Sequence, residues 1–591
     1  MKNLQNKFIS GLDGLRAIAV IMVVGYHLSF SLFKGGVLGV TIFFVISGFL
    51  ITRLLLQELE NKNSIDLKNF WINRIKRIWP ALVFMISITI IVSAIFNRVL
   101  FTKACRDFIS AILGFNNWYQ IFNNISYFDN GGAPSPLLHC WSLAIETQFY
   151  LIFPIIIILV SKFKSKKNER NRILSIITLL LIVISTSLMA LLFQPTGDPS
   201  RVYYGLDTRA FSLLVGALLA IITQCDFKVS LKKSVYDIGG IISLFIICLI
   251  VGRVAGYDEF LYKGGYLIVS ILTAFVILSI LRKNSILSKI LSISVIDWLG
   301  KLSYSIYLWH YPIIILMSGG KKSSILTVSI EILLTLIMSV ISYYVIETPI
   351  RKGIIAQTFN LLKEKKYNTK LKKGLSTISL CLVLIISSVL CVAFVPKETM
   401  SNNIASKTPK KEKTVEKQMT TETTSDDDML YSLDLLILGD SVADGASEML
   451  HQTFPSSPID AKVSRHCSES VPIFQTYLDH GWDGAGLVYS LGTNGPIYDS
   501  LPKIRSMLPK NKSMFILTIR APYKQWSDDN NEKIKKFCDK NDNVYLIDWI
   551  SYSKGHDDWF VSDETHLTNE GTVGFSNCIK EKILEVFKDK K

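Results

Sequence analysis

Two kinds of stabilising feature are missing from this sequence. Its nine cysteines are spread over 591 residues without a CxxC pair, which argues against a zinc site and against a dense disulfide framework. A cleavable signal peptide is not expected either, because the first apolar run, 15–33, carries Arg16 and His27 and has no small-residue cleavage site. We therefore expect no bound metal, and we expect this run to remain in the protein as a helix.

Acidic residues are too few to balance the basic ones. Against 64 Lys and Arg there are 48 Asp and Glu, a net charge of +16. Such an excess can indicate nucleic-acid binding, but here the basic residues lie between apolar stretches rather than on one polar face. With 49% hydrophobic residues and a mean hydropathy of +0.35, the chain is too apolar for a soluble protein. The expected partner is a lipid bilayer, and nucleic acid is not expected.

Eleven apolar runs are long enough to cross a bilayer, since each span needs about 20 residues. They lie at 12–30, 36–57, 79–97, 142–160, 173–193, 208–223, 237–252, 264–281, 303–317, 324–345 and 376–395.

The basic residues between these runs predict the orientation of the chain. If the N-terminus is cytoplasmic, the inner segments hold 28 Lys and Arg and the outer segments hold 9. The positive-inside rule favours this arrangement. We therefore expect a multi-pass protein of the cell membrane with a cytoplasmic N-terminus. An odd number of spans puts everything after residue 395 outside the cell.

Changes in composition divide the chain into four parts. A helical membrane domain occupies 1–352, and 353–395 contains a cytoplasmic loop and the last span. Residues 396–430 are polar and charged, cannot bury a core, and are expected to be a flexible extracytoplasmic linker. In 431–591, the runs "LDLLILG", "AGLVYSLG", "SMFILTI" and "NVYLIDW" alternate with polar, helix-like segments. That alternation predicts a single α/β domain with a parallel sheet.

Catalytic-type side chains follow the strands of this predicted sheet. Ser441 lies just beyond the first strand in "ILGDSVADG", Asn494 follows another in "SLGTNG", and Asp563 and His566 are three apart in "SDETHLTNEG". Active groups gather at the carboxyl ends of parallel strands. A serine hydroxyl needs a base, the base needs an orienting carboxylate, and an oxyanion needs donors. Taken singly, Gly-Asp-Ser is more often an ordinary turn, and Asp-x-x-His is usually a surface pair.

Together and in this order, these motifs resemble the SGNH (GDSL-like) hydrolase family over roughly 431–591. The resemblance implies that Ser441 is the nucleophile, His566 the base and Asp563 the residue that orients it. It also implies that the Ser441 amide and Asn494 donate to the oxyanion.

One block departs from the family pattern. Where the family usually has an oxyanion glycine, "DAKVSRHCS" offers Ser464. Arg465 follows, and it is expected either to contact an acidic substrate or to be a solvated surface residue. Cys467, Cys538 and Cys578 could include one disulfide, and their odd number leaves at least one thiol free.

Ionisable groups within the predicted spans are costly in lipid and suggest function. The first helix carries Asp13 and Arg16 at its inner end and His27 near its outer end. Function and a simple interfacial or capping role are equally plausible for His27. In "FWINRIKRIWPAL", Arg74 and Arg77 share one helix face at the cytoplasmic boundary. Positive-inside charge explains one arginine, but two on one face also suit a phosphate-rich ligand.

Other polar side chains of the predicted spans are expected to face a shared interior. Glu146 lies about one turn into the fourth apolar run and needs a partner. The remaining members are His139, Trp141, Ser142, Gln148, Tyr150, Asp207, Arg209, Ser303, Tyr304, Tyr307 and His310.

Residues 9–352 resemble the acyltransferase-3 family of integral membrane acyltransferases. The motifs that carry the resemblance are the His27 helix, "FFVISGFLIT", "RIKR", "WSLAIETQFYLIFP", and "LSYSIYLWHYPI" followed by "ETPIRK". The family usually has two acidic residues in the fourth of these helices. Here Thr147 takes the second place, which leaves Glu146 as the expected carboxylate.

The resemblance implies acetyl-CoA as a cytoplasmic acyl donor, with the acetyl group delivered to the outer side. Arg74 and Arg77, together with Arg16, would bind the coenzyme A phosphates. His27 with Glu146 would act on the acyl group.

A bundle of this family joined to an SGNH domain resembles the OatA-type peptidoglycan O-acetyltransferases. The resemblance implies that acetyl passes to Ser441 and then to a cell-wall sugar, with the C6 hydroxyl of N-acetylmuramic acid as the favoured acceptor. Another cell-surface polysaccharide remains an open acceptor. The outer domain could instead be a carbohydrate esterase, and a non-enzymatic transporter or sensor is the third interpretation.

Overall fold

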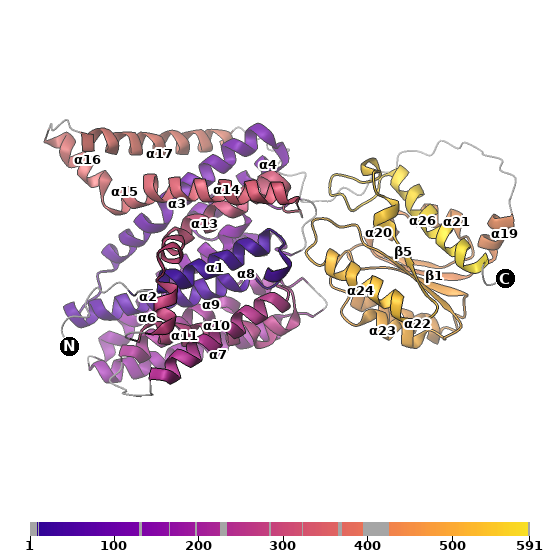
Figure 1. Cartoon of the computed structure of the whole chain (residues 1–591), viewed down its shortest axis with the longest axis horizontal. Helices are drawn as coiled ribbons and strands as arrows, with labels where there is room; N and C mark the ends of the chain where they lie inside the picture. Colours follow the sequence, from indigo (N-terminus) through magenta and orange to yellow (C-terminus); the bar gives the residue numbers. More distant parts are fainter. Residues whose placement is uncertain are drawn as a thin grey trace. The chain divides into compact units, whose positions relative to one another are not determined.

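The described residues form two compact units, one helical and one α/β (Figure 1). A computed structural model describes residues 9, 11–128, 133–164, 166–195, 198–224, 233–282, 285–321, 323–364, 369–393 and 425–588. The helical unit precedes the α/β unit in the chain, and each is considered by itself below.

The helical unit is built from long apolar helices joined by short ones. Its α-helices are α1 (Leu12–His27), α2 (Leu38–Lys62), α3 (Leu67–Phe96), α4 (Arg98–Leu113), α5 (Asn116–Phe122), α6 (Trp141–Phe163), α7 (Lys167–Leu192), α8 (Ser200–Tyr204), α9 (Leu206–Gln224), α10 (Lys233–Arg253), α11 (Tyr266–Ile280), α12 (Ile286–Leu291), α13 (Ser294–Ser318), α14 (Ile325–Ile341), α15 (Thr348–Arg351), α16 (Ile354–Lys363) and α17 (Thr369–Ala393). Short 3-10 turns occur at Ser31–Phe33 and Leu138–Cys140, and π-helical turns at Leu261–Gly265 and Ser342–Glu347.

The eleven apolar runs all coincide with helices in this unit. Within the described residues, 8 helices are long and apolar enough to cross a membrane. The full count of eleven spans stays a prediction, because α1, for example, has only 16 residues. The segment 98–141, expected as an outer connection, instead contains two further helices, α4 and α5.

Glycines bring the central helices of this unit into close contact. A Cβ atom added to Gly48 of α2 would overlap the Leu213 carbonyl oxygen of α9, and one added to Gly216 of α9 would overlap the Val45 carbonyl oxygen of α2. Small residues allow such backbone approach in membrane bundles, where close packing rather than hydrophobic burial drives association. The same reciprocal contact therefore holds α2 and α9 together.

The α/β unit contains one five-stranded parallel sheet. Its strands are β1 (Leu435–Gly439), β2 (Ile459–Ala461), β3 (Gly486–Ser490), β4 (Ser513–Leu517) and β5 (Val544–Ile547), in the order β2-β1-β3-β4-β5. Its helices are α19 (Ser425–Ser432), α20 (Ser441–Gly445), α21 (Ser447–Thr453), α22 (Ser470–Asp479), α23 (Ser500–Met507), α24 (Ser527–Lys540), α25 (Trp549–Tyr552) and α26 (Asn569–Lys588). The predicted fold class is confirmed, and β2 is the strand that was not predicted.

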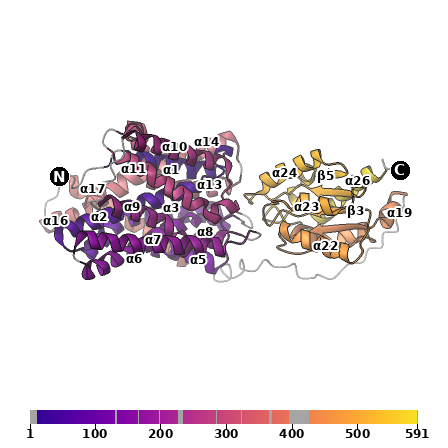
Figure 2. The same cartoon turned by 90° about the horizontal axis from the view of Figure 1, so that it is seen from below.

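Helices cover both faces of this sheet and create two cores. Along β1, Leu435 and Ile437 face the core under α21 and α26, whereas Leu436 and Leu438 face the core under α22, α23 and α24. Figure 1 shows the two groups of helices on opposite sides of the strands, and Figure 2 shows the unit from below. Because alternate side chains of a strand point to opposite faces, a strand buried on both sides reads as a continuous apolar run.

The α/β unit begins before residue 431. Residues 396–424 of the expected linker lie outside the described residues, but its last part belongs to α19. Leu430 in that helix is 1% exposed and packs into the core beneath α26. Burial of Leu430 therefore extends the folded α/β unit into a segment whose other residues are mostly polar.

We expect Leu430→Ala to lower the free energy of unfolding of a 425–591 fragment by about 2–4 kcal/mol, because a cavity would replace the buried side chain. Urea unfolding followed by circular dichroism would measure the change. Tyr431→Ala is the matched control, since this side chain is 44% exposed, and it should cost less than about 0.5 kcal/mol. Equal effects of the two substitutions would contradict a core that includes α19.

Candidate active sites

The first candidate site lies at the carboxyl end of β1. The strand ends at Gly439, and Ser441 begins the short helix α20. Between them, the buried Asp440 carboxylate accepts hydrogen bonds from the amides of Val442 and Thr493, both at 3.1 Å. This carboxylate therefore joins the loop after β1 to the loop after β3 and fixes the backbone beside Ser441. The sequence analysis did not identify Asp440 as part of the site.

Three side chains meet here as a hydrogen-bonded chain. Nε2 of His566 lies 2.9 Å from Oγ of Ser441, and Nδ1 of His566 lies 2.6 Å from Oδ2 of Asp563. The other carboxylate oxygen accepts from the amides of Thr565 and His566 at 2.9 Å. A carboxylate can only accept, so Nδ1 carries a proton and Nε2 has the lone pair that faces the serine hydroxyl. This geometry suits removal of the Ser441 proton by His566.

The electrostatics of these groups fit the same chemistry. The hydrogen bond to Asp563 raises the pKa of His566 above its ordinary value, and burial opposes this only in part. For Asp563, burial alone would raise the pKa, but hydrogen bonds from the His566 ring and from the amides of His566 and Thr565 lower it. Asp563 is therefore ionised when His566 titrates. Lys524 is a further neighbour that no sequence motif indicated, and burial lowers its pKa to about 8.

The segments after β2 and β3 approach each other near this site. Nδ2 of Asn494 donates to the Arg465 carbonyl oxygen at 3.4 Å. Ser464, immediately before it, has φ of 61°, a left-handed conformation that favours glycine. That conformation fits the expectation that glycine usually occupies this position. The oxyanion roles of Asn494 and Ser464 stay predictions.

Arg465 is not the solvated surface residue that was one expectation, and its contact with an acidic substrate stays a prediction. Its side chain is 5% exposed and forms an ion pair with Asp460 at 2.5 Å. It also donates to the carbonyl oxygen of Gly439 at 3.2 Å and to that of Asp460. Buried carbonyl groups need donors; the guanidinium donates to one carbonyl of β1 and one of β2, and the Lys462 amide also donates to that of Gly439. Arg465 thus braces the sheet edge and is shielded from solvent.

No disulfide forms among the three cysteines of this unit within the part of the chain that is described. Cys467, Cys538 and Cys578 are free. Cys578 belongs to the core under α26, whereas Cys467 and Cys538 belong to the core on the opposite face of the sheet. The sheet itself therefore separates Cys578 from the other two thiols.

The second candidate site is a cavity of about 650 Å³ in the helical unit. All three arginines expected to bind the donor line it: Arg16 from α1, and Arg74 and Arg77 from α3. Other charged lining residues are Asp13, Arg53, Glu146, Lys301, Glu347 and Arg351. Cations outnumber carboxylates six to three among these side chains, so the cavity suits an anionic ligand.

Two guanidinium groups in this cavity, those of Arg16 and Arg74, have N–H donors available for further hydrogen bonds. Nε of Arg74 is buried and, among the described residues, has no hydrogen-bond acceptor. Arg16 contacts Asp13 through a single 3.3 Å interaction. Buried donors without acceptors are unfavourable, and guanidinium forks match phosphate oxygens. A ligand with phosphate groups would complete these hydrogen bonds.

Glu146 lies in this cavity and has two hydroxyl donors. Its Oε1 accepts hydrogen bonds from Ser47 of α2 and from Tyr150, one turn further along α6. The expected partner of Glu146 is therefore a pair of hydroxyl groups. The carboxylate also lies close enough to Arg16 and Arg74 to interact with their charges.

His27 does not lie with Glu146, contrary to the expected pairing. Nδ1 of His27 is 3.2 Å from Nε2 of His310 on α13, and the His310 ring is 5.9 Å from that of His139. His27 ends α1, whereas Arg16 lies near its beginning. Eleven residues of helix separate them by about 16 Å along the axis. The sequence could not reveal which neighbouring helix meets each end of α1.

Tyr307 and Ser142 lie between the cavity and these three histidines. Both residues line the cavity, and their hydroxyl oxygens are 2.6 Å apart. The Tyr307 hydroxyl also donates to the His139 carbonyl oxygen at 2.9 Å, and its ring centroid is 5.4 Å from that of His310. The cavity and the group of three histidines are therefore adjacent within the helical unit, with the hydrogen-bonded pair Tyr307 and Ser142 between them.

A proline accounts for the position of His139. Nε2 of His139 donates to the Leu308 carbonyl oxygen at 3.1 Å. In a regular helix this carbonyl would accept from the amide four residues later, but that residue is Pro312, which has no N–H. The sequence "LWHYP" therefore releases one backbone acceptor into the bundle, and His139 satisfies it.

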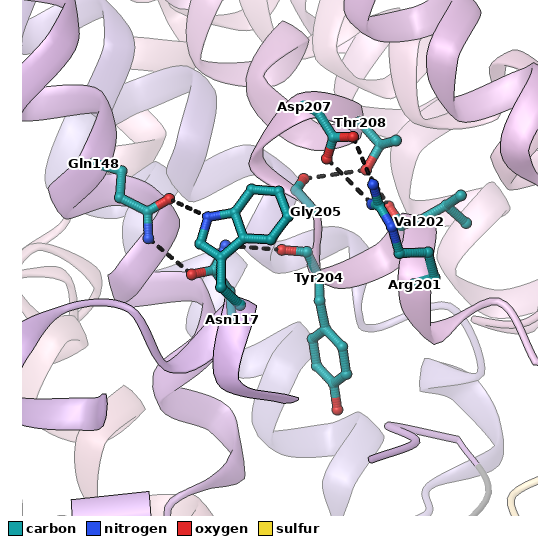
Figure 3. Close-up of polar contacts among 9 residues, drawn as sticks. Asn117, Gln148, Arg201, Val202, Tyr204, Gly205, Asp207 and Thr208 are labelled. Atoms are coloured by element: carbon teal, nitrogen blue, oxygen red, sulfur yellow. Dashed lines mark hydrogen bonds and ion pairs between the residues drawn. The ribbon is translucent and has the colours of Figure 1, made fainter. Parts of the chain in front are cut away.

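Several polar residues expected in the shared interior do not line the cavity. Arg201 forms an ion pair with Asp207 at 2.8 Å (Figure 3). In the same view, the Gln148 amide donates to Asn117 Oδ1 at 2.8 Å. Arg209 is fully buried, donates to Thr41 at 3.1 Å and lies 4.0 Å from the centre of the Tyr266 ring. These contacts join helices to one another and have a structural role.

Comparison with known protein families matches residues 9–347 to Acyl_transf_3, an acyltransferase domain. Peptidoglycan O-acetyltransferase OatA of Listeria monocytogenes serovar 1/2a (strain ATCC BAA-679 / EGD-e) is 36% identical over 96% of this chain and 97% of its own length. O-acetyltransferase OatA of Staphylococcus aureus (strain MRSA252) is 37% identical over 97% of this chain and 96% of its own.

One similar solved structure is the C-terminal catalytic domain of Streptococcus pneumoniae peptidoglycan O-acetyltransferase A (OatA) with a methylsulfonyl adduct. It aligns with 27% of this chain and 96% of its own, at 20% identity and a TM-score of 0.25.

We expect hydrolysis of an acetyl ester by the 425–591 fragment to slow as the pH falls through the raised pKa of His566, because the base must be neutral. The acid limb of the rate profile should therefore lie above pH 6.5, the ordinary histidine value. Asp563→Asn removes the interaction that raises this pKa, so the limb should move to lower pH. The maximal rate should fall about 10⁴-fold, because the tautomer is no longer fixed.

The control for this profile is His480→Asn, which changes an exposed histidine and should leave rate and profile as they are. An acid limb that stays in place in Asp563→Asn would show that another group titrates.

Proposed function

From the premise that the chain belongs to the Acyl_transf_3 family and is an O-acetyltransferase of the OatA type, we propose that it moves acetyl from cytoplasmic acetyl-CoA to an outer cell-wall glycan. The family match covers most of the helical unit, and the relatives named above align over nearly their whole length. The observation that supports the proposal is that one chain has two candidate sites with hydrogen-bonded histidines: His566 beside Ser441, and His27 in the helical unit.

The arginine-lined cavity is the proposed donor site. Arg16, Arg74 and Arg77 would hold the phosphates of acetyl-CoA, and the unsatisfied Nε of Arg74 supports an anionic ligand there. Glu146, hydrogen-bonded to Ser47 and Tyr150, would orient the guanidinium groups. Acetyl-CoA is elongated, with phosphates at one end and a thioester at the other. It suits a cavity that arginines line and that adjoins the three histidines at Tyr307 and Ser142.

His27 is the proposed base for the first transfer. An acceptor hydroxyl attacks the thioester carbonyl carbon, and its proton passes to Nε2 of His27. The new C–O bond forms, the C–S bond breaks, and the coenzyme A sulfur leaves with the proton from His27. General-base assistance of this kind contributes about 10²–10⁴ to a rate.

Ser441 is the proposed acetyl carrier in the α/β unit. His566 takes its proton as Oγ attacks the acetyl carbonyl, and the proton then goes to the departing oxygen, which leaves an acetyl-serine. In the second half, a sugar hydroxyl gives its proton to His566 and attacks the acetyl-serine. Acetyl moves to the sugar oxygen, and Ser441 recovers its proton.

The proposed acceptor is peptidoglycan, with the C6 hydroxyl of N-acetylmuramic acid as the preferred position. The names of the relatives support the polymer, and the sequence resemblance supports the position. The excess of basic residues in alternate connections supports a cytoplasmic N-terminus and an extracytoplasmic α/β unit. In that arrangement, coenzyme A stays inside while Ser441 can reach the wall.

A carbohydrate esterase is the second candidate function for the α/β unit alone. The His566 side chain is 46% exposed, so water can reach the acyl group as readily as a sugar hydroxyl can. Acetate would then be the product in place of an acetylated glycan.

We expect the double variant Arg74→Ala, Arg77→Ala to lose acetylation of the wall glycan in cells by at least about 10²-fold, because the donor phosphates lose their guanidinium partners. Mass spectrometry of wall fragments from cells that carry each variant of the full chain would measure this. Lys76→Ala is the matched control: it removes a cation from the same helical turn, and Lys76 is exposed and lies outside the cavity lining.

Normal wall acetylation in the double variant would exclude this cavity as the donor site. Loss in the double variant but not in Ser441→Ala would retain the donor site and reject Ser441 as the carrier.

We also expect the 425–591 fragment to gain one acetyl group on Ser441 after brief exposure to an activated acetyl ester. Intact-protein mass spectrometry would detect the adduct, and Ser441→Ala should lack it. Added glycan should collect the acetyl group, whereas an esterase would release acetate alone. Asn494→Ala should slow acetylation by about 10²–10³, because one oxyanion donor is lost while the nucleophile remains. An adduct that persists in Ser441→Ala would refute the carrier assignment.

A further inference from the structure

The hydrogen bonds of His27 and His310 define which ring nitrogen of each carries a proton. Nδ1 of His310 lies 3.1 Å from the Ile306 carbonyl oxygen, and Nδ1 of His27 lies 2.9 Å from that of Val23. A carbonyl oxygen only accepts, so each Nδ1 is the protonated nitrogen of its neutral ring. The lone pair of His310 is therefore on Nε2, which lies 3.2 Å from Nδ1 of His27. The single Nδ1–H of His27 is thus shared between this nitrogen and the Val23 carbonyl oxygen.

This contact resembles the contact between His566 and Asp563, although Nδ1–H of His27 has a second acceptor in the Val23 carbonyl oxygen. In both cases Nδ1–H of a proposed base faces a fixed acceptor, which leaves the lone pair on Nε2. Asp563 accepts with a carboxylate oxygen, and His310 accepts with an imidazole nitrogen. An acceptor at Nδ1 orients the ring and stabilises the imidazolium that forms when Nε2 takes a proton.

We propose that His310 is a positioning residue of the membrane site: together with the Val23 carbonyl oxygen it holds Nδ1–H of His27, and its lone pair stabilises the imidazolium that forms when Nε2 takes a proton in the acyl-transfer reaction. The proposal rests on the function proposed above, in which His27 is the base. His310 acts through His27 and does not itself contact the donor.

Burial explains why a neutral acceptor occupies this position. His310 is fully buried, and its ring packs against the rings of Tyr307, at 5.4 Å, and His139, at 5.9 Å. An ionised carboxylate in such surroundings is costly unless it is paired. A neutral imidazole offers a directed lone pair without that cost, and it still stabilises the cation that forms on His27.

The backbone of α13 holds His310 rigidly enough for this role. Its Nδ1–H is bonded to Ile306 one turn earlier, and α13 packs along α1, the helix that carries His27. The carbonyl freed by Pro312 anchors His139 beside it. A ring held by its own helix and packed on two sides has little freedom to turn away from His27.

The test compares two substitutions of nearly equal size. His310→Gln keeps an acceptor oxygen, whereas His310→Met offers only a weakly accepting thioether. Full-length protein in proteoliposomes would be given acetyl-CoA, and release of the coenzyme A thiol would be followed over a range of donor concentrations. We expect kcat of His310→Met to fall about 10²–10⁴-fold, while the KM for acetyl-CoA changes less than about threefold. His310→Gln should recover at least about tenfold of the lost kcat.

Two further variants make the outcome specific. Tyr311→Phe is the packing control, since it changes a ring 4.9 Å from that of His27 without removing the Nδ1 acceptor, and it should retain normal kcat. His27→Ala should be inactive, and adding His310→Met to it should cause no further loss, because the positioning residue then has nothing to position.

If the Met variant does not accumulate, His310→Ala measured with and without added imidazole makes the same comparison, and imidazole should restore activity. Equal kcat for the Gln and Met variants, or no rescue by imidazole, would overturn the proposal. Normal turnover in His27→Ala would instead refute the proposed function of His27. Loss in His27→Ala together with normal kcat in His310→Met would refute the present inference alone.

Discussion

Both candidate sites depend on a histidine whose Nδ1–H is held by a fixed acceptor. In the α/β unit the acceptor is the Asp563 carboxylate, 2.6 Å from Nδ1 of His566. In the helical unit the Nδ1–H of His27 is shared by the Val23 carbonyl oxygen, at 2.9 Å, and Nε2 of His310, at 3.2 Å. Without such an acceptor an imidazole can turn and exchange tautomers, and its lone pair has no defined direction. Further hydrogen bonds keep these acceptors in place. The amides of Thr565 and His566 donate to Asp563, and Nδ1 of His310 donates to the Ile306 carbonyl oxygen.

The surroundings of each acceptor account for its chemical type. Asp563 is partly exposed and accepts hydrogen bonds from two backbone amides, and both features stabilise its ionised form. His310 is enclosed by apolar and aromatic side chains, where a charge without a partner would be unfavourable. The backbone also adapts to its surroundings. Pro312 leaves the Leu308 carbonyl without its helical donor, and His139 supplies one. In the α/β unit, Arg465 donates to the carbonyl groups of Gly439 in β1 and Asp460 in β2.

Local patterns in the sequence predicted most of the α/β unit, and contacts between distant segments account for the errors. The apolar runs of β1, β3, β4 and β5 are unambiguous because both faces of the sheet are covered, whereas β2 has three half-buried residues and no such run. That Ser441, Asp563 and His566 meet was predicted from the resemblance of their motifs, taken in order, to the SGNH family, and the structure brings them together. The burial of Arg465 was missed because its partners, the Asp460 carboxylate and the carbonyl groups of Gly439 and Asp460, are brought to it by the fold and leave no pattern in the sequence. The eleven apolar runs predicted helices but did not predict which helices contact one another. His27 of α1 meets His310 of α13, and Glu146 of α6 meets Ser47 of α2.

Three segments of the helical unit each have a residue that lines the cavity at one level and a histidine at another. On α1, Arg16 lines the cavity and His27 lies about 16 Å further on; on α13, Ser303 lines the cavity and His310 follows about 10 Å later. The segment that leads into α6 runs in the opposite sense, from His139 to Ser142 and then to Glu146. Charged groups thus gather at one level of the bundle and neutral histidines at another, with Tyr307 and Ser142 between them. This division meets two requirements that conflict in a single pocket. The proposed donor's phosphates need cations, which draw water, while its thioester needs a neutral base and protection from water until the acceptor hydroxyl attacks.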